Sequence, residues 1–157
     1  MTTENVGSKL KLIFADDIMT TEVVVIKESM LIGQVAHLML KERVSSYPIV
    51  DEQGNLAGIV TLTDLFNLID KLIRESKAYL KKYEWQAVEA AVKSAKGKPI
   101  SEIMSKNVVT VKPETPLLEI LEHVSTNKIH TFPVVRDGKL IGIVGRHDVL
   151  NATFVYG

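Results

Sequence analysis

The order of apolar and polar positions predicts the same series of elements twice along the chain. Each copy starts with a short β-branched run, at 23–26 and at 108–111, that is typical of a strand. Apolar residues then recur at helical spacing over 32–39 and 117–124, which predicts an amphipathic helix in each copy.

Each predicted helix is followed by two further apolar runs and a second helix. The runs flank polar turns at 51–55 and 136–139, and the Asp-Gly pair in the second turn is a hairpin signal. The second helix is expected to begin after Asp64 in one copy and after Asp148 in the other. Each copy therefore predicts strand, helix, strand, strand, helix.

The two copies also share residues. Displacing the sequence by 85 positions, and by 84 after a one-residue gap in the hairpin turn, aligns fourteen identical residues in order. They include Ile18-Met19 with Ile103-Met104, and Asp64 with Asp148. An ordered set of identities with a single gap indicates an internal duplication.

We expect an α/β (α+β) fold of two β-α-β-β-α repeats, at 13–67 and 99–154, joined by a helical linker at 68–98. A unit of about 55 residues buries too little surface to be stable alone. The repeats are therefore expected to pack around a pseudo-twofold axis. Equivalent residues of both copies would then line shared clefts, which are natural ligand sites.

Composition narrows the class of protein. The 157 residues include no cysteine, which excludes a disulfide framework, a thiolate nucleophile and a thiolate zinc site. No apolar run approaches the roughly 20 residues that span a bilayer, and no secretion signal is recognisable, so we expect a cytoplasmic protein without a membrane segment. Nineteen basic residues balance nineteen acidic ones, which argues against a nucleic-acid binder.

Signatures of catalysis are missing from the sequence. There is no serine-nucleophile motif, no phosphate-loop lysine motif and no dinucleotide glycine motif, and the four histidines are not paired at metal-ligand spacing. We therefore expect a protein that is not an enzyme, with no catalytic residue and no metal site.

The linker carries a local basic excess. Between Asp70 and Lys98 there are eight basic and four acidic residues. One interpretation is a solvated helix whose lysine stems cover apolar surface. The other is a docking face for an acidic partner or for single-stranded nucleic acid, which the few aromatic residues support weakly.

A set of motifs recurs at equivalent places in both copies. Tyr47-Pro48-Ile49-Val50 with Gly58 to Asp64, and Phe132-Pro133-Val134-Val135 with Gly142 to Asp148, follow an Ile-Met pair that opens each copy. Together they resemble the cystathionine-β-synthase (CBS) domain. The resemblance implies a tandem CBS pair that fills most of the chain, as in a stand-alone CBS-domain protein. Such a regulatory module commonly binds adenosine-containing ligands in two clefts and often forms a disc-shaped homodimer.

The resemblance also implies which residues bind the ligand. A carboxylate at the strand-to-helix junction can accept both hydrogen bonds of a ribose diol, and Asp64 and Asp148 hold that place. One cleft is expected to combine Thr61, Thr63 and Asp64 with Ser105, Thr110 and His130. The other is expected to combine Arg146, His147 and Asp148 with Thr20, Val25, Val44 and Ser45.

Three features leave alternatives open. Gly145 holds the position in the second copy that is equivalent to Thr61, so no hydroxyl is present there. The two clefts are therefore chemically unequal, and the sequence is compatible with a ligand in one cleft or in both. The aspartates and threonines are also typical helix caps. His130 is equally compatible with a half-buried side chain bonded to the backbone.

The leading hypothesis is a sensor of AMP, ADP or ATP. Ligand binding would shift the packing of the repeats or a homodimer interface, and the module would thereby act on a partner protein. The alternatives are a ligand-independent dimerisation or protein-interaction module, binding of S-adenosylmethionine, and single-stranded nucleic-acid binding through the linker.

Overall fold

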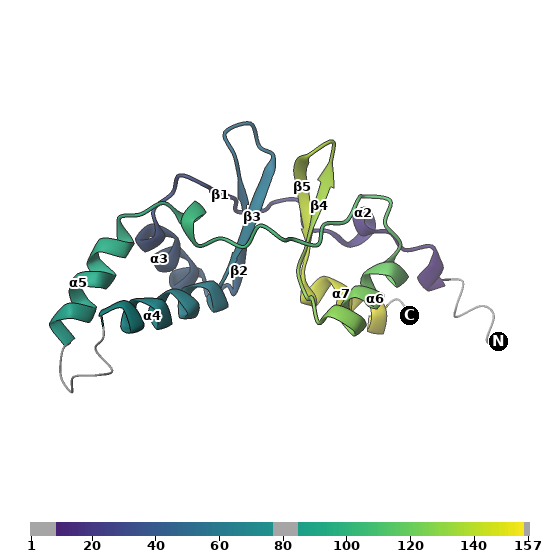
Figure 1. The fold of residues 1–157 in the computed structure, drawn as a ribbon. Coiled ribbons are helices and arrows are strands. Elements are labelled where there is room, and N and C mark those ends of the chain that lie inside the picture. The colour runs from purple at the N-terminus through teal and green to yellow at the C-terminus, as the bar shows by residue number, and fades with distance from the viewer. Residues whose placement is uncertain (1–8, 77–84, 156–157) are drawn as a thin grey trace. The chain divides into compact units, whose positions relative to one another are not determined.

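The computed structural model describes residues 9–76 and 85–155. Its helices and strands confirm the α+β class and, apart from one strand, the predicted order of elements in each repeat (Figure 1). Contacts divide the chain into two compact units. Unit 1 contains residues up to Val24, Gly54–Leu56 and residues from Val108 onward, and unit 2 contains Val25–Gln53 and Ala57–Asn107. No helix of the described residues has the length and apolar character needed to cross a membrane.

Unit 2 is built on a three-stranded sheet of order β1-β2-β3. Strand β1 runs parallel to β2, with Ile26 opposite Ile49. The elements are β1 (Ile26–Lys27), α3 (Ile32–Glu42), β2 (Ser46–Val50), β3 (Leu56–Thr61), α4 (Leu62–Ser76), α5 (Trp85–Lys96) and the short 3₁₀ helix η1 (Ile100–Glu102).

The core of unit 2 forms between this sheet and the apolar face of α3. Ile32, Val35 and Met39 lie three and four residues apart on α3, so they share one face, and all three are buried. They pack with Ile26 and Ile49 of the sheet. The apolar residues that recur at helical spacing in the sequence are thus the residues that α3 buries.

Unit 1 is built on an antiparallel hairpin. Its elements are α2 (Ala15–Ile18), α6 (Leu117–Asn127), β4 (Phe132–Arg136), β5 (Lys139–Val144) and α7 (Arg146–Val155). Asp137 and Gly138 connect the strands with φ angles of 51° and 79°, as the primed hairpin turn requires. Phe132 pairs with Val144 at the other end of the hairpin, where both side chains are buried.

Each unit completes its core with the segment that opens the other repeat in the sequence. Ala15 of α2 is buried in unit 1 among Phe132 and Val144. Ile100 of η1 is buried in unit 2, and its N–H donates to the carbonyl of Met30 at 2.7 Å. The repeat ranges 13–67 and 99–154 therefore describe the duplication along the chain, whereas the compact units cut across them.

The linker prediction covers two helices. The range 68–98 takes in the end of α4 and all of α5, which contact each other in unit 2. Residues 77–84 of that range lie outside the described residues.

Two details of the sequence prediction are wrong. The strand expected at 23–26 is limited to Ile26 and Lys27, because Val24 and Val25 are 54% and 43% exposed and pair with no strand in the described chain. The run 108–111 forms no strand, and Val111 makes a single bridge to Val134. β-Branched residues favour extended backbone, but a strand also needs a neighbour to pair with.

The second helices begin earlier than expected. They start at Leu62 and Arg146, two residues before Asp64 and Asp148. The reason is the cap: each aspartate lies in the first helical turn, and its side chain reaches back to the backbone of the residue before the helix.

Candidate functional site

The strand-to-helix turn of unit 2 is closed by Thr61 and Asp64. Oδ2 of Asp64 accepts the backbone N–H of Thr61 at 2.8 Å and the Thr61 hydroxyl at 3.2 Å. In return, the N–H of Asp64 donates to Oγ1 of Thr61 at 3.3 Å. This reciprocal arrangement is a capping box. The capping alternative for both residues is therefore present in the structure, and it uses Oδ2 of Asp64 and not Oδ1.

Ser105 brings a second segment to this carboxylate. Its N–H and carbonyl bond Ile59 of β3 at 2.8 and 2.9 Å, and its hydroxyl donates to Oδ1 of Asp64 at 3.0 Å. Gly58 permits the approach, because a Cβ there would lie 2.7 Å from the Ser105 carbonyl oxygen. Three of the predicted residues, Thr61, Asp64 and Ser105, thus form one hydrogen-bonded cluster.

Unit 1 repeats the arrangement without the bonds that the hydroxyls of Thr61 and Ser105 make in unit 2. Thr20 bonds Ile143 of β5 through its N–H and carbonyl at 2.8 and 2.9 Å, as Ser105 bonds Ile59. The N–H of Gly145 donates to Oδ2 of Asp148 at 2.8 Å. In the described part of the chain, the Thr20 hydroxyl makes no hydrogen bond to Asp148, and the N–H of Gly145 is the one donor to that carboxylate.

The other predicted residues are divided between the units. Val25, Val44, Ser45 and Thr63 belong to unit 2, while Thr110, His130, Arg146 and His147 belong to unit 1. The carbonyl of Ser45 accepts the N–H of Leu62 at 3.0 Å, which places Ser45 beside the first turn of α4. His130, Arg146 and His147 are exposed.

The hairpin register places His130 at one end of unit 1. β4 begins at Phe132, which pairs with the last residue of β5, Val144. His130 therefore precedes β4 at the same end of the hairpin where Gly145 and Asp148 follow β5.

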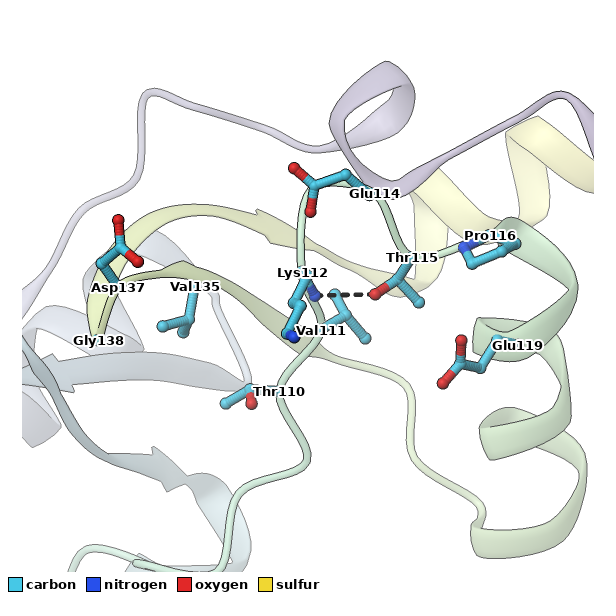
Figure 2. A pocket seen from close by; sticks show the side chains of 10 residues that line it. All are labelled: Thr110, Val111, Lys112, Glu114, Thr115, Pro116, Glu119, Val135, Asp137 and Gly138. Atoms are coloured by element: carbon cyan, nitrogen blue, oxygen red, sulfur yellow. Dashed lines mark hydrogen bonds between the residues drawn. The ribbon is translucent and has the colours of Figure 1, made fainter.

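A separate pocket of about 560 Å³ lies at the opposite end of this hairpin. Figure 2 shows the loop of Lys112, Glu114 and Thr115 on one side and the turn of Asp137 and Gly138 on the other. The N–H of Lys112 donates to the Thr115 hydroxyl at 2.9 Å, which holds that loop. Thr110 is the one predicted site residue among those that line this pocket.

This pocket was not predictable from the sequence, because its walls come from a loop, a turn and a helix start without a recognisable motif. The Ser105 bond to Asp64 was also missed as a contact, although both residues were predicted for one cleft. The duplication carries a signal for it: Ser105 and Thr20 each follow an Ile-Met pair, and each makes a β-bridge to the last strand of a hairpin. Within the described ranges, no group of three or more His, Asp or Glu side chains forms a candidate metal cluster.

Known proteins resemble this chain over nearly its whole length. An uncharacterised protein of Methanocaldococcus jannaschii, MJ1426, is 30% identical over 94% of this chain and 94% of its own. Homoserine O-acetyltransferase of Methanohalobium evestigatum is 27% identical over 87% of this chain. That match spans 23% of the enzyme, so the chain corresponds to a small part of it.

Solved structures share the fold. The CBS domain of a CBS-domain-containing membrane protein from Sphaerobacter thermophilus has a TM-score of 0.72 and 31% identity, over 94% of this chain and 92% of that one. CBSX2 in complex with AMP has a TM-score of 0.70 and 26% identity, over 90% and 96%.

A third structure holds other adenosine compounds. The CBS domain pair of protein MJ0100, in complex with 5′-methylthioadenosine and S-adenosyl-L-methionine, has a TM-score of 0.63 and 26% identity, over 90% of this chain and 95% of that one. The family model described as the CBS domain matches residues 15–71 and 100–154. Because these ranges include both repeats and most of the chain, the protein belongs to the CBS domain family.

Proposed function

We propose that this protein is a regulatory module that binds an adenine nucleotide, AMP, ADP or ATP, at its strand-to-helix turns. The observation that carries the proposal is the paired geometry of Asp64 and Asp148. Each carboxylate is held at the start of a helix, next to a segment docked on the preceding strand by two backbone hydrogen bonds. A carboxylate fixed in this way suits the two hydroxyls of a ribose.

The surroundings of each turn suit the rest of a nucleotide. The first N–H groups of α4 and α7 lie at these turns, and helix N-termini favour anions such as phosphate. Arg146 adds a cation and a bidentate donor at the Asp148 turn. His130 lies at the same end of the hairpin. Binding of AMP by CBSX2 and of S-adenosyl-L-methionine by MJ0100 supports the same ligand class here.

The role proposed for the ligand is regulatory. We expect a nucleotide to shift the equilibrium between two states of the repeats or of a homodimer, which requires different affinities for the two states. The module would then act on a partner protein in the cytoplasm without catalysing a reaction itself. The homoserine O-acetyltransferase match fits this role, because there the chain corresponds to a small part of a longer enzyme.

Isothermal titration of the full chain with AMP, ADP, ATP and S-adenosylmethionine tests the proposal. Saturable binding of one adenine nucleotide, with a rise in melting temperature at saturating ligand, is the expected result. Preferential binding of S-adenosylmethionine would change the ligand assignment. The absence of heat and of any melting shift with all four, at millimolar concentration, would overturn the proposal.

A second candidate function is a ligand-independent dimerisation module. It is favoured by large apolar side chains that α4 and α7, the second helices of the two repeats, expose. On α4, Phe66 is 68% and Ile69 is 46% exposed, and on α7, Phe154 is 80% exposed. Clusters of exposed apolar residues are typical of interaction surfaces. A homodimer that forms equally with and without nucleotide would favour this candidate over the sensor.

A further inference from the structure

The two candidate carboxylates differ in how many hydrogen bonds they already accept. Asp64 accepts three: the N–H and hydroxyl of Thr61 on Oδ2, and the hydroxyl of Ser105 on Oδ1. Asp148 accepts one in the described structure, the N–H of Gly145. A carboxylate offers about four acceptor positions. Asp64 therefore retains one position, whereas Asp148 retains three.

A ribose diol needs two of these positions, because each hydroxyl donates one hydrogen bond. Asp148 can accept both hydroxyls without losing a bond. Asp64 can accept the second hydroxyl only if one of its present donors leaves.

The donor that leaves most easily is the Ser105 hydroxyl. The Thr61 N–H belongs to the backbone, and the Thr61 hydroxyl is held from its other side by the N–H of Asp64. The Ser105 hydroxyl makes one bond, to Asp64, and its side chain can rotate while the backbone stays bonded to Ile59.

We infer that Ser105 competes with the ribose for Asp64, so that it weakens nucleotide binding at this turn and lets the Asp148 turn fill first. Ser105 is then a positioning residue that sets the affinity of one turn through Asp64. This inference rests on the proposed function. The equivalent position in the other repeat, Thr20, makes no such bond to Asp148 in the described part of the chain.

The test isolates the Asp64 turn in the full chain. Asp148→Asn removes the charge of the other turn while its amide oxygen can still accept the Gly145 N–H. In this background, AMP affinity is measured by isothermal titration with Ser105, with Ser105→Ala and with Ser105→Thr. Loss of one competing hydrogen bond is expected to tighten AMP binding about 2- to 10-fold in Ser105→Ala. Ser105→Thr keeps the hydroxyl and is expected to retain the weaker binding.

Ser101→Ala is the matched control for the substitution. Ser101 lies in η1 of the same segment, and no hydrogen bond of its hydroxyl occurs among the described residues. Its AMP affinity is expected to equal that of the Asp148→Asn parent. A gain as large as that of Ser105→Ala would show a general effect on the segment and overturn the inference.

A ligand with one ribose hydroxyl fewer separates competition from a purely structural effect of Ser105 on AMP affinity. 2′-Deoxy-AMP donates a single hydrogen bond, which the remaining acceptor position of Asp64 can take. The gain from Ser105→Ala is therefore expected with AMP and not with 2′-deoxy-AMP.

The outcomes separate this inference from the proposed function. Unchanged or weaker AMP binding by Ser105→Ala, in a parent that binds AMP, would overturn the competition and leave the proposed function standing. No AMP binding by the wild type or by the parent would overturn the inference together with AMP as a ligand of the Asp64 turn.

Discussion

Gly58 lies so close to Ser105 that a Cβ on Gly58 would be 2.7 Å from the Ser105 carbonyl oxygen. Gly142 stands in the corresponding relation to the segment of Met19 and Thr20: an added Cβ would lie 3.1 Å from the Thr20 carbonyl oxygen and 2.7 Å from Sδ of Met19. Real Cβ atoms do not approach other heavy atoms to this distance. The glycines of the two repeats are thus fixed by the segments that dock on β3 and β5.

Gly58→Ala is therefore expected to destabilise the fold by about 1–3 kcal/mol, because the docked backbone must move to make room. Gly97→Ala is the control, since a Cβ there meets its nearest atom at an ordinary 3.6 Å, and a change within about 0.5 kcal/mol is expected. Urea unfolding of both variants measures the difference. Equal stability of the two variants would contradict the close packing of Ser105 on β3.

Asp64→Ala is expected to lower two quantities at once. Loss of the cap lowers the free energy of unfolding by about 0.5–2 kcal/mol. Loss of the ribose acceptor weakens nucleotide binding at this turn by about 10- to 100-fold, or roughly 1.5–3 kcal/mol. Thermal unfolding measures the first effect, and AMP titration of the Asp148→Asn background measures the second. A loss of stability with unchanged AMP affinity would show that Asp64 caps the helix and does not bind the ribose.

Tyr47 is expected to make the protein sensitive to alkali. Burial, and secondarily the negative charge of Glu42, raise the pKa of the Tyr47 hydroxyl above its ordinary 10.0. The unfolded chain therefore loses this proton first as the pH rises, so stability falls from about pH 10 up to the folded pKa. Below pH 10 both states hold the proton and the group has no effect on the pH dependence.

Tyr47→Phe removes this contribution. The difference in unfolding free energy between the wild type and Tyr47→Phe should be constant below pH 10 and shift in favour of the variant above it. Urea unfolding at several pH values measures this difference. Parallel stability curves across that window would show that Tyr47 ionises equally in both states.

The exposed apolar residues of α4 make a homodimer testable. If this surface joins two copies, Phe66→Glu places a charge in an apolar interface, so the chain should change from dimer to monomer in analytical ultracentrifugation. Asn67→Glu is the control: it adds the same charge at the neighbouring position of α4, which is exposed and polar, and should leave the dimer intact. A wild-type monomer, or a dimer unaffected by Phe66→Glu, would remove α4 from the interface.

The repeat made most of the fold accessible from the sequence. The helical period at Ile32, Val35 and Met39 predicted α3 and its buried face, and the Asp-Gly pair predicted the β4–β5 turn. The runs at 23–26 and 108–111 misled because residue type alone does not say whether a neighbouring strand is present. Val24 and Val25 are exposed for that reason.

The burial of a segment of each repeat in the core built by the other repeat was not predictable from periodicity. The pattern around Ala15 and Ile100 marks them as apolar, but it does not say which repeat buries them. The candidate site was likewise predictable only in part. Asp64 and Asp148 were recognised from motif and position, while the hydrogen bond from Ser105 to Asp64 depends on a contact between residues 41 positions apart.

AMP titration of the double variant Asp64→Asn/Asp148→Asn measures whether Asp64 and Asp148 bind the ribose of an adenine nucleotide. Asparagine keeps an acceptor for the N–H groups of Thr61 and Gly145, so the turns should remain closed. We expect the wild type to bind AMP and the folded double variant to bind it at least about 10-fold more weakly. Equal AMP affinity of the two proteins would contradict this role of the two aspartates.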